Sequence, residues 1–113
     1  MTSRRYVPDR GDIVWLDFNP QAGHEQKGRR PALTVSYREY NGKVGLGLFC
    51  PITRKIKGYP FEVAVIGKTI SGCVLADQVR SLDWTVRDIG YIEKLDDEKL
   101  DDVIASIVIL MRK

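Results

Sequence analysis

The chain has 113 residues, a formal net charge of +3 and a hydrophobic fraction of 43%. This length and composition predict a single globular domain over residues 1–113 and exclude a multidomain protein. No run approaches the roughly 20 apolar residues of a membrane span, and residues 1–10 lack the apolar segment of a signal peptide, so we expect a cytoplasmic protein without membrane contact.

The positions of the charged residues and the cysteines indicate which partners and which kinds of site this protein can have. Residues 96–102 hold five acids and one lysine, a local charge of −4 that leaves +7 on the remaining chain. A basic body with a separate acidic patch is consistent with a polyanionic partner. Cys50 and Cys73 lie in apolar runs without CxxC spacing, which favours packed, reduced thiols over a disulfide or a metal site.

The first predicted strand, residues 13–16, is apolar on both faces (IVWL). A strand of this kind must be covered on both faces. We expect the core of its own domain to cover one face and a second copy of the chain to cover the other.

Residues 17–31 then form a predicted loop between two strands. The stretch of about twelve connecting residues is long for a hairpin, and loops of that length are usually functional. It holds the only histidine, His24, beside the carboxylate of Glu25. Its cations are Lys27, Arg29 and Arg30. Histidine and carboxylate can exchange protons and cations can hold a phosphate, so the loop is equipped to grip or attack a nucleic-acid backbone.

Two strands separated by a turn are predicted next. Residues 32–36 alternate in hydropathy, which places Thr34 and Ser36 on the outer face. Residues 40–43 (YNGK) have turn chemistry. Residues 44–52 then alternate with a period of two, with Phe49 and two glycines on the outer face.

Three further strands are expected at residues 61–65, 73–79 and 89–92. In the second of these, strict alternation turns Asp77 toward the apolar side. A buried carboxylate needs a cationic partner, and Arg30 or Arg80 can provide one.

One helix is predicted, at the C-terminus. Asp96 or Asp97 can cap its first turn, and cations follow at its end, which suits the helix macrodipole. Its apolar residues recur at helical spacing and form a stripe for core packing: Leu100, Val103, Ile104, Ile107, Val108 and Met111. Short strands with glycine-rich turns and one helix predict a mainly β (α+β) fold, a small, strongly curved antiparallel barrel with the helix packed across it.

Residues 23–31 (GHEQKGRRP) resemble the GxEQxGxRP signature of the MazF/PemK/Kid toxins, sequence-selective endoribonucleases of type II toxin–antitoxin systems. The likeness continues, in order, through residues 11–15 (GDIVW), 51–53 (PIT), 58–63 (GYPFEV) and 75–79 (LADQV). The resemblance implies an SH3-like, PemK/CcdB-like barrel that forms a homodimer. It also implies a toxin that cleaves single-stranded RNA, with mRNA as the expected target, and thereby stops translation and growth.

The residues indicate a reaction without metal or cofactor. One histidine, two distant cysteines and no carboxylate cluster outside the predicted helix do not make a metal site. RNA supplies its own nucleophile, the 2′-hydroxyl, so the enzyme must remove that proton, stabilise charge on phosphorus and protonate the leaving oxygen. The expected products are a 2′,3′-cyclic phosphate and a 5′-hydroxyl end.

Five residues are candidates for this chemistry. Arg30 is expected to stabilise the charge on phosphorus, because its planar guanidinium matches two phosphate oxygens. Glu25 is the candidate base and His24 the candidate acid. The resemblance assigns Thr53 to the family threonine that holds the scissile phosphate. Asp77 is either part of a structural ion pair or a base competing with Glu25, and Leu75 stands where Kid-type members have an arginine.

The RNA contacts are expected from cations interleaved with rings. Arg54, Lys55 and Lys57 precede Tyr59 and Phe61, a mixture that suits a single-stranded backbone with bases stacked on aromatic rings. The predicted RNA-binding residues are Lys27, Arg29, Arg54, Lys55, Lys57, Phe61 and Gln78.

The resemblance further implies a MazE-like antitoxin whose acidic tail occludes the RNA site. Trp15 and Trp84 are the candidate anchors for it, since tryptophan is enriched at interfaces. No DNA contact is expected except through the antitoxin. Two alternatives remain: a CcdB-like toxin that poisons DNA gyrase by protein binding, and a passive RNA-binding barrel.

Overall fold

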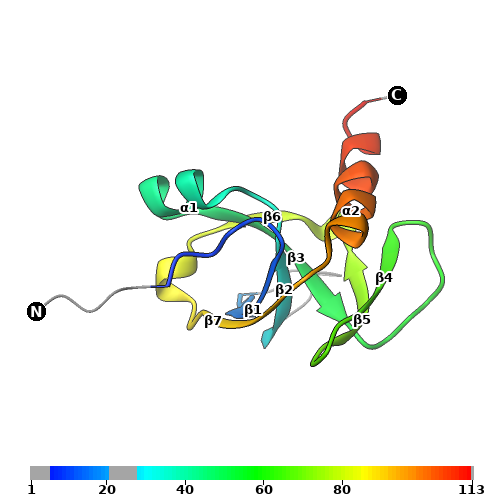
Figure 1. The fold of residues 1–113 in the computed structure, drawn as a ribbon, viewed down its shortest axis with the longest axis horizontal. Coiled ribbons are helices and arrows are strands. Elements are labelled where there is room, and N and C mark those ends of the chain that lie inside the picture. The colour runs from blue at the N-terminus through cyan, green and yellow to red at the C-terminus, as the bar shows by residue number, and fades with distance from the viewer. Residues whose placement is uncertain (1–5, 21–27, 113) are drawn as a thin grey trace, which may run out of the picture.

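The computed structural model describes residues 6–20 and 28–112. In chain order the elements are β1 (Asp12–Asp17), β2 (Arg29–Thr34), α1 (Arg38–Val44), β3 (Gly47–Thr53), β4 (Glu62–Ile66), β5 (Ser71–Leu75), η1 (Ala76–Gln78), β6 (Arg80–Leu82), η2 (Trp84–Val86), β7 (Gly90–Lys94) and α2 (Asp97–Ile109), where η marks a 3-10 helix. The seven strands form one antiparallel sheet in the order β4-β5-β3-β2-β1-β7, and β6 pairs with β3. The sheet curls into a half-barrel, and α2 stands over the end that carries β4 and β5 (Figure 1). The predicted mainly β class with a C-terminal helix is confirmed.

The sheet separates two hydrophobic cores. Alternate residues of β1 face opposite ways, so Ile13 belongs to one core and Val14 to the other. The first core is completed by Leu100 and Val103 of α2, and the second by Leu82 and Trp84. The chain itself fully buries Ile13, Val14 and Leu16, and of the predicted strand only Trp15 is exposed, at 37%. The prediction that a second copy covers one whole face of this strand is therefore wrong. Sequence spacing does not show that residues 82–84 return over the sheet.

The predicted turn at residues 40–43 is wrong, because these residues lie in α1. The helix is held by Asn41, which is fully buried and whose side-chain amide donates to the carbonyls of Pro8 (2.8 Å) and Ser36 (3.0 Å). Gly45 ends the helix with a left-handed φ of 81°. The strand predicted from residue 44 consequently begins three residues later, at Gly47.

The inward and outward faces of β2 and β3 also differ from the prediction. Alternation predicts Phe49 and Thr34 on the outer face, and both are fully buried. The central strands have a core on each side over most of their length, so alternation there does not separate inside from outside.

The predicted fifth strand is too long. β5 ends at Leu75, and residues 76–78 turn into η1, which leaves Asp77 exposed instead of facing the apolar side. The short strand β6 is not among the predicted elements. The predicted sixth strand is present as β7, shifted toward the C-terminus by about one residue at its start.

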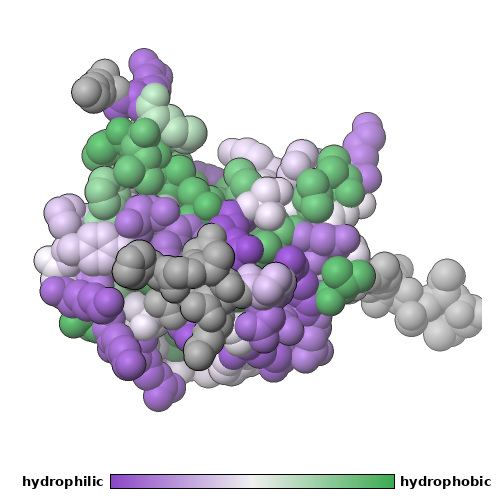
Figure 2. Space-filling model, turned by 180° about the vertical axis from the view of Figure 1, so that it is seen from behind, coloured by the Kyte–Doolittle hydropathy of each residue, from purple (hydrophilic) through white to green (hydrophobic). Residues whose placement is uncertain are grey.

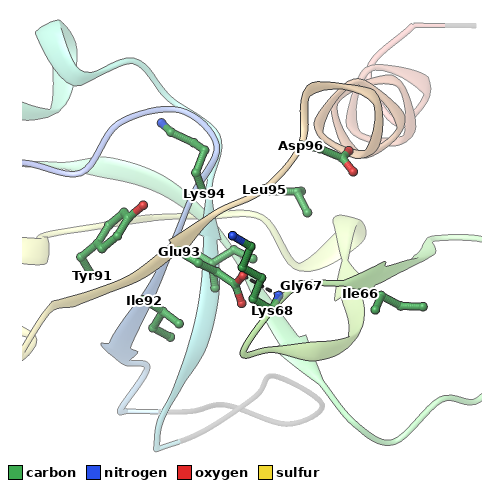
Figure 3. Close-up of a pocket in the computed structure, with 10 residues that line it drawn as sticks. Ile66, Gly67, Lys68, Tyr91, Ile92, Glu93, Lys94, Leu95 and Asp96 are labelled. Carbon is green, nitrogen blue, oxygen red and sulfur yellow. Dashed lines mark hydrogen bonds between the residues drawn. The ribbon is translucent and has the colours of Figure 1, made fainter.

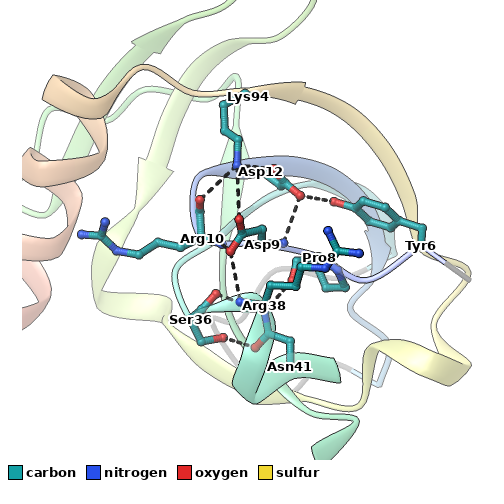
Figure 4. Close-up of polar contacts among 9 residues, drawn as sticks. All are labelled: Tyr6, Pro8, Asp9, Arg10, Asp12, Ser36, Arg38, Asn41 and Lys94. Atoms are coloured by element: carbon teal, nitrogen blue, oxygen red, sulfur yellow. Dashed lines mark hydrogen bonds and ion pairs between the residues drawn. The ribbon is translucent and has the colours of Figure 1, made fainter. Parts of the chain in front are cut away.

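A polar cluster joins the N-terminal segment, β1 and β7 (Figure 4). The buried carboxylate of Asp12 accepts from the Tyr6 hydroxyl and from the Asp9 N–H (3.0 Å), and it pairs with the Lys94 ammonium at 2.7 Å. Burial and the bond to Asp12 raise the pKa of Tyr6 above its ordinary value, so the hydroxyl stays a donor. A buried carboxylate with this many partners is compensated for its lost hydration.

Glu93 of β7 connects the two edges of the sheet (Figure 3). Its carboxylate accepts from the backbone N–H groups of Lys68 (2.8 Å), Thr69 (2.9 Å) and Ile70 (2.8 Å) in the β4–β5 turn. Burial raises the pKa of this carboxyl, but the three hydrogen bonds outweigh that effect and the pKa lies below its ordinary value. Beside this contact lies a cavity of about 450 Å³ lined by residues of β7 and the turn.

The C-terminal helix begins as predicted. Asp96 caps it by accepting from the Lys99 N–H at 2.8 Å. Only the first half of its apolar stripe is buried: Leu100 and Val103 lie in the core, whereas Val108 and Met111 are 40% and 72% exposed. Figure 2 shows hydrophobic side chains gathered over this helix. None of the helices in residues 6–20 and 28–112 could span a lipid bilayer.

Candidate functional site

A pocket of about 240 Å³ brings together two of the predicted catalytic residues. Arg30 of β2 and Thr53 at the end of β3 both line it, and these strands are neighbours in the sheet. The remaining lining residues are Trp15, Pro31, Ile52, Arg54, Ile70 and Ser71. Residues separated by more than twenty positions thus meet because two strands pair.

Arg30 is positioned by the strand beside it. Its Nη1 donates to the carbonyl of Ile52 at 3.5 Å, a long contact that orients the guanidinium along β3. Partial burial lowers the pKa of Arg30, yet an arginine stays charged at any working pH. A half-buried cation acts on an anion more strongly than a fully hydrated one, since screening is weaker.

Thr53 contributes a hydroxyl of low accessibility, with 8% of the residue exposed. Its Oγ1 accepts from the Lys55 N–H at 3.1 Å, which fixes the side chain at the strand end. A hydroxyl that accepts through a lone pair still has its own proton to donate. Thr53 can therefore donate to an oxygen of a phosphate held by Arg30.

Three predicted residues, His24, Glu25 and Lys27, lie outside the described residues. Both ends of their segment are described and lie together. The Phe18 N–H donates to the Gly28 carbonyl (2.9 Å), and the Gly28 N–H donates to Asn19 Oδ1 (3.0 Å). Arg30, which lines the pocket, follows Gly28 by two residues. The hydrogen-bonded ends of the segment therefore lie next to the strand residue that enters the pocket.

Arg87 supports the loop base and is not among the residues predicted from the sequence. Its Nη1 donates to the carbonyls of Asp17 (3.0 Å) and Asn19 (2.8 Å). A side chain that binds backbone carbonyls leaves no motif, so no pattern in the sequence could have identified this role.

Arg29, a predicted RNA contact, has partners within the chain. Its Nε lies 3.0 Å from Asp88 Oδ2, and the guanidinium lies 5.4 Å from the centroid of the Trp15 ring. Asp88 has a positive φ of 53°. The charge of Arg29 is thus partly balanced by a carboxylate before any partner binds.

The basic residues after Thr53 occupy the connection between β3 and β4. Arg54, Lys55 and Lys57 are exposed, and Arg54 also lines the pocket. Phe61 and Gln78 are half-buried.

Asp77 faces this connection, where its Oδ1 accepts from the Tyr59 hydroxyl at 2.6 Å. Burial and that hydrogen bond raise the pKa of Tyr59 to about 12. The contact differs from the expected burial of Asp77 against an arginine, because η1 turns the carboxylate outward.

The two tryptophans differ. Trp15 is 37% exposed at the pocket, where a partner can reach it. Trp84 is 4% exposed, and its indole N–H donates to the Asn41 carbonyl at 3.2 Å. Trp84 is therefore a core residue, and the prediction that it contacts an antitoxin is corrected on this ground.

Both cysteines are buried free thiols, as predicted. Burial raises the pKa of Cys50 to about 12, which keeps the thiol protonated and unreactive.

Comparisons with known proteins give consistent matches. The model of the family described as "PemK-like, MazF-like toxin of type II toxin-antitoxin system" matches residues 9–111. The chain is 45% identical over 107 residues to the endoribonuclease toxin MazF of Escherichia coli K12, covering 95% of this chain and 96% of the relative. It is 27% identical to the endoribonuclease PemK of Escherichia coli, covering 95% and 84%.

Solved structures agree in fold. MazF from Deinococcus radiodurans superposes with a TM-score of 0.92 at 48% identity, covering 96% of this chain and all of that one. A MazE–MazF structure from the same organism matches with a TM-score of 0.83 at 42% identity, covering 95% and 97%.

Proposed function

Since this chain belongs to the family of PemK-like and MazF-like toxins of type II toxin–antitoxin systems, and is an endoribonuclease toxin, we propose that it cleaves single-stranded RNA without a metal ion. The observation that carries this proposal is the meeting of Arg30 and Thr53 in one pocket. Both residues can hold a phosphate, and both lie in motifs that the family shares.

The proposed reaction is an internal transesterification. The 2′-oxygen attacks phosphorus as its proton passes to a base, the bond to the 5′-oxygen breaks, and that oxygen receives a proton. Arg30 stabilises the charge on the pentavalent phosphorus, and Thr53 donates to one of its oxygens. Glu25 is the proposed base and His24 the proposed acid, with Asp77 as the competing base. The products are a 2′,3′-cyclic phosphate and a 5′-hydroxyl end.

RNA is proposed to continue from the pocket along the exposed cations Arg54, Lys55 and Lys57. Lys27, Arg29, Phe61 and Gln78 complete the proposed RNA contacts. Cutting mRNA in the cytoplasm would halt translation and growth. The gyrase-poisoning alternative is not favoured, because the curated relatives are endoribonucleases by name.

The proposal predicts cleavage in the presence of a chelator. Purified protein incubated with unstructured RNA in EDTA should produce fragments with 2′,3′-cyclic phosphate and 5′-hydroxyl ends, identified by selective end labelling. The Arg30→Ala protein serves as the contamination control. Intact RNA in EDTA with cleavage restored by magnesium would contradict the metal-free reaction. Binding of RNA without cleavage in either condition would favour a passive RNA-binding barrel.

An antitoxin similar to MazE is the proposed protein partner. Solved MazE–MazF structures from Deinococcus radiodurans contain a relative of this chain. Trp15 offers an exposed ring beside the pocket, so an acidic, apolar-anchored segment bound there would cover both the ring and Arg30. Such binding would inhibit the toxin by occupying its phosphate site.

A homodimer is proposed through the apolar end of α2. Ile109 and Met111 are 64% and 72% exposed, and a small chain gains stability by burying such a surface against a second copy. The double variant Ile109→Lys, Met111→Lys should halve the mass measured by light scattering. Val86→Lys, at an equally exposed apolar position on η2, is the control and should stay dimeric. An unchanged mass for the double variant would place the interface elsewhere.

A further inference from the structure

The connection between β3 and β4 has a defined shape although it contains no helix or strand. We call residues 54–60 the basic loop, after Arg54, Lys55 and Lys57. It starts at Thr53 in the pocket, where the Lys55 N–H is bound to the threonine hydroxyl. It leads into Glu62, the first residue of β4.

Glu62 binds back onto the loop that precedes it. One carboxylate oxygen accepts from the Lys57 N–H at 2.9 Å, and the other accepts from the Gly58 N–H at 2.7 Å. The Glu62 N–H in turn donates to the Tyr59 carbonyl at 3.1 Å. The backbone hydrogen bond from Lys57 is the main cause that lowers the pKa of the Glu62 carboxyl, so the group is ionised in use.

The loop conformation depends on these bonds. Gly58 has a left-handed φ of 83°, which bends the chain so that two successive N–H groups converge on the carboxylate. The Tyr59 hydroxyl, bound to Asp77 at 2.6 Å, adds a second attachment on η1. Together these contacts hold the loop against two separate elements, β4 and η1.

The charge of Glu62 opposes the binding of RNA. A carboxylate among three exposed cations repels a polyanion, and its loss would favour binding if charge were all that mattered. The hydrogen bonds of Glu62 favour RNA binding instead, because they order the basic loop before RNA arrives. A loop ordered in advance spares the bound complex the entropy cost of ordering it.

We propose that Glu62 is a positioning residue for RNA binding, which, with the Tyr59 hydroxyl, holds the basic loop in the shape that meets the RNA backbone. The proposal rests on the RNA cleavage inferred above. The effect of Glu62 is expected on affinity more than on the chemical step, because its carboxylate binds the Lys57 and Gly58 N–H groups and not the Lys55 N–H that holds the Thr53 hydroxyl.

The decisive test is whether Glu62→Gln weakens or strengthens the binding of RNA. The wild type is first used to find a short single-stranded RNA that it cuts once, and binding is then measured on the same RNA with a 2′-deoxyribose at the cut site. The variant should bind about tenfold more weakly despite the removal of a negative charge, with kcat within about twofold. The slope of log affinity against log salt should fall by about 0.7 for each phosphate group that the variant no longer touches.

Glu98→Gln is the matched control, with the same charge change at an exposed position on α2. It should bind RNA at least as tightly as the wild type. Equal or tighter binding by Glu62→Gln, with an unchanged salt slope, would overturn the proposal. A wild-type protein that cuts no RNA would instead refute the proposed function.

Tyr59→Phe tests the second attachment without any change in charge. Loss of the hydroxyl should weaken RNA binding about threefold or more, while Tyr40→Phe, on the exposed face of α1, should leave affinity unchanged. Circular dichroism establishes whether each variant is folded. If Glu62→Gln is unfolded, Tyr59→Phe decides, and wild-type affinity in that variant overturns the proposal.

Discussion

Replacing Arg30 with alanine should slow RNA cleavage by about 100-fold or more, the scale on which losing one transition-state donor acts. Arg30 is half-buried and lines the same pocket as Thr53. Arg54, the other cation that lines this pocket, is exposed, so we do not expect it to replace Arg30. The measurement is the single-turnover rate on saturating RNA. Arg38→Ala, which removes the same charge from exposed α1, should cut at the wild-type rate.

A folded Arg30→Ala protein that cleaves at the wild-type rate would remove Arg30 from the reaction. The same assay separates the proposed proton-transfer groups. Glu25→Gln should lower the rate over the whole pH range if Glu25 is the base, and His24→Ala should remove the limb of the pH–rate profile in which the acid titrates. A profile that His24→Ala leaves unchanged would make His24 a spectator.

Replacing Trp84 with alanine should reduce the free energy of unfolding by about 3–5 kcal/mol. The ring is 4% exposed within the second core, and its removal leaves a cavity and takes a donor from the Asn41 carbonyl. Urea unfolding at one fixed protein concentration measures the change, since association also affects apparent stability. Trp15→Ala, at the exposed tryptophan, should cost about 1 kcal/mol or less.

A Trp84→Ala protein as stable as the wild type would show that the second core does not depend on this ring. Trp84→Phe retains most of the packing and leaves Trp15 as the only tryptophan. Its fluorescence should still respond to an added MazE-like antitoxin. No response would separate Trp15 from the proposed antitoxin contact.

The class of fold could be predicted because it follows from patterns visible in the sequence. The candidate site residues come from the same patterns, and their roles stay predictions. Alternating strands, an acidic cap at Asp96 and a shared loop motif are all visible in the sequence. The resemblance and the chemistry of phosphate binding together predict that Arg30 and Thr53 act on one phosphate, and the pocket joins them.

The failures have tertiary causes. Asn41 and Gly42 have the composition of a turn, but the buried amide of Asn41 finds partners in Pro8 and Ser36 that only the folded chain supplies. The environment predicted for Asp77 is wrong because the strand ends at Leu75. Glu62 and Arg87 bind backbone groups, which carry no residue identity, so their roles could not be inferred from spacing.

In a sheet with a hydrophobic core on each face, burial alone does not fix the register of a strand. If β1 slid by one residue, Ile13 and Val14 would exchange sides, and both would still be buried among apolar neighbours. Hydrophobicity therefore cannot select the correct pairing. Asp12 selects the correct pairing, because a shift of β1 by one residue would separate the Asp12 carboxylate from Lys94 and Tyr6. The charged cluster at the start of β1 thus selects the register of this strand, whereas the two cores stabilise the sheet.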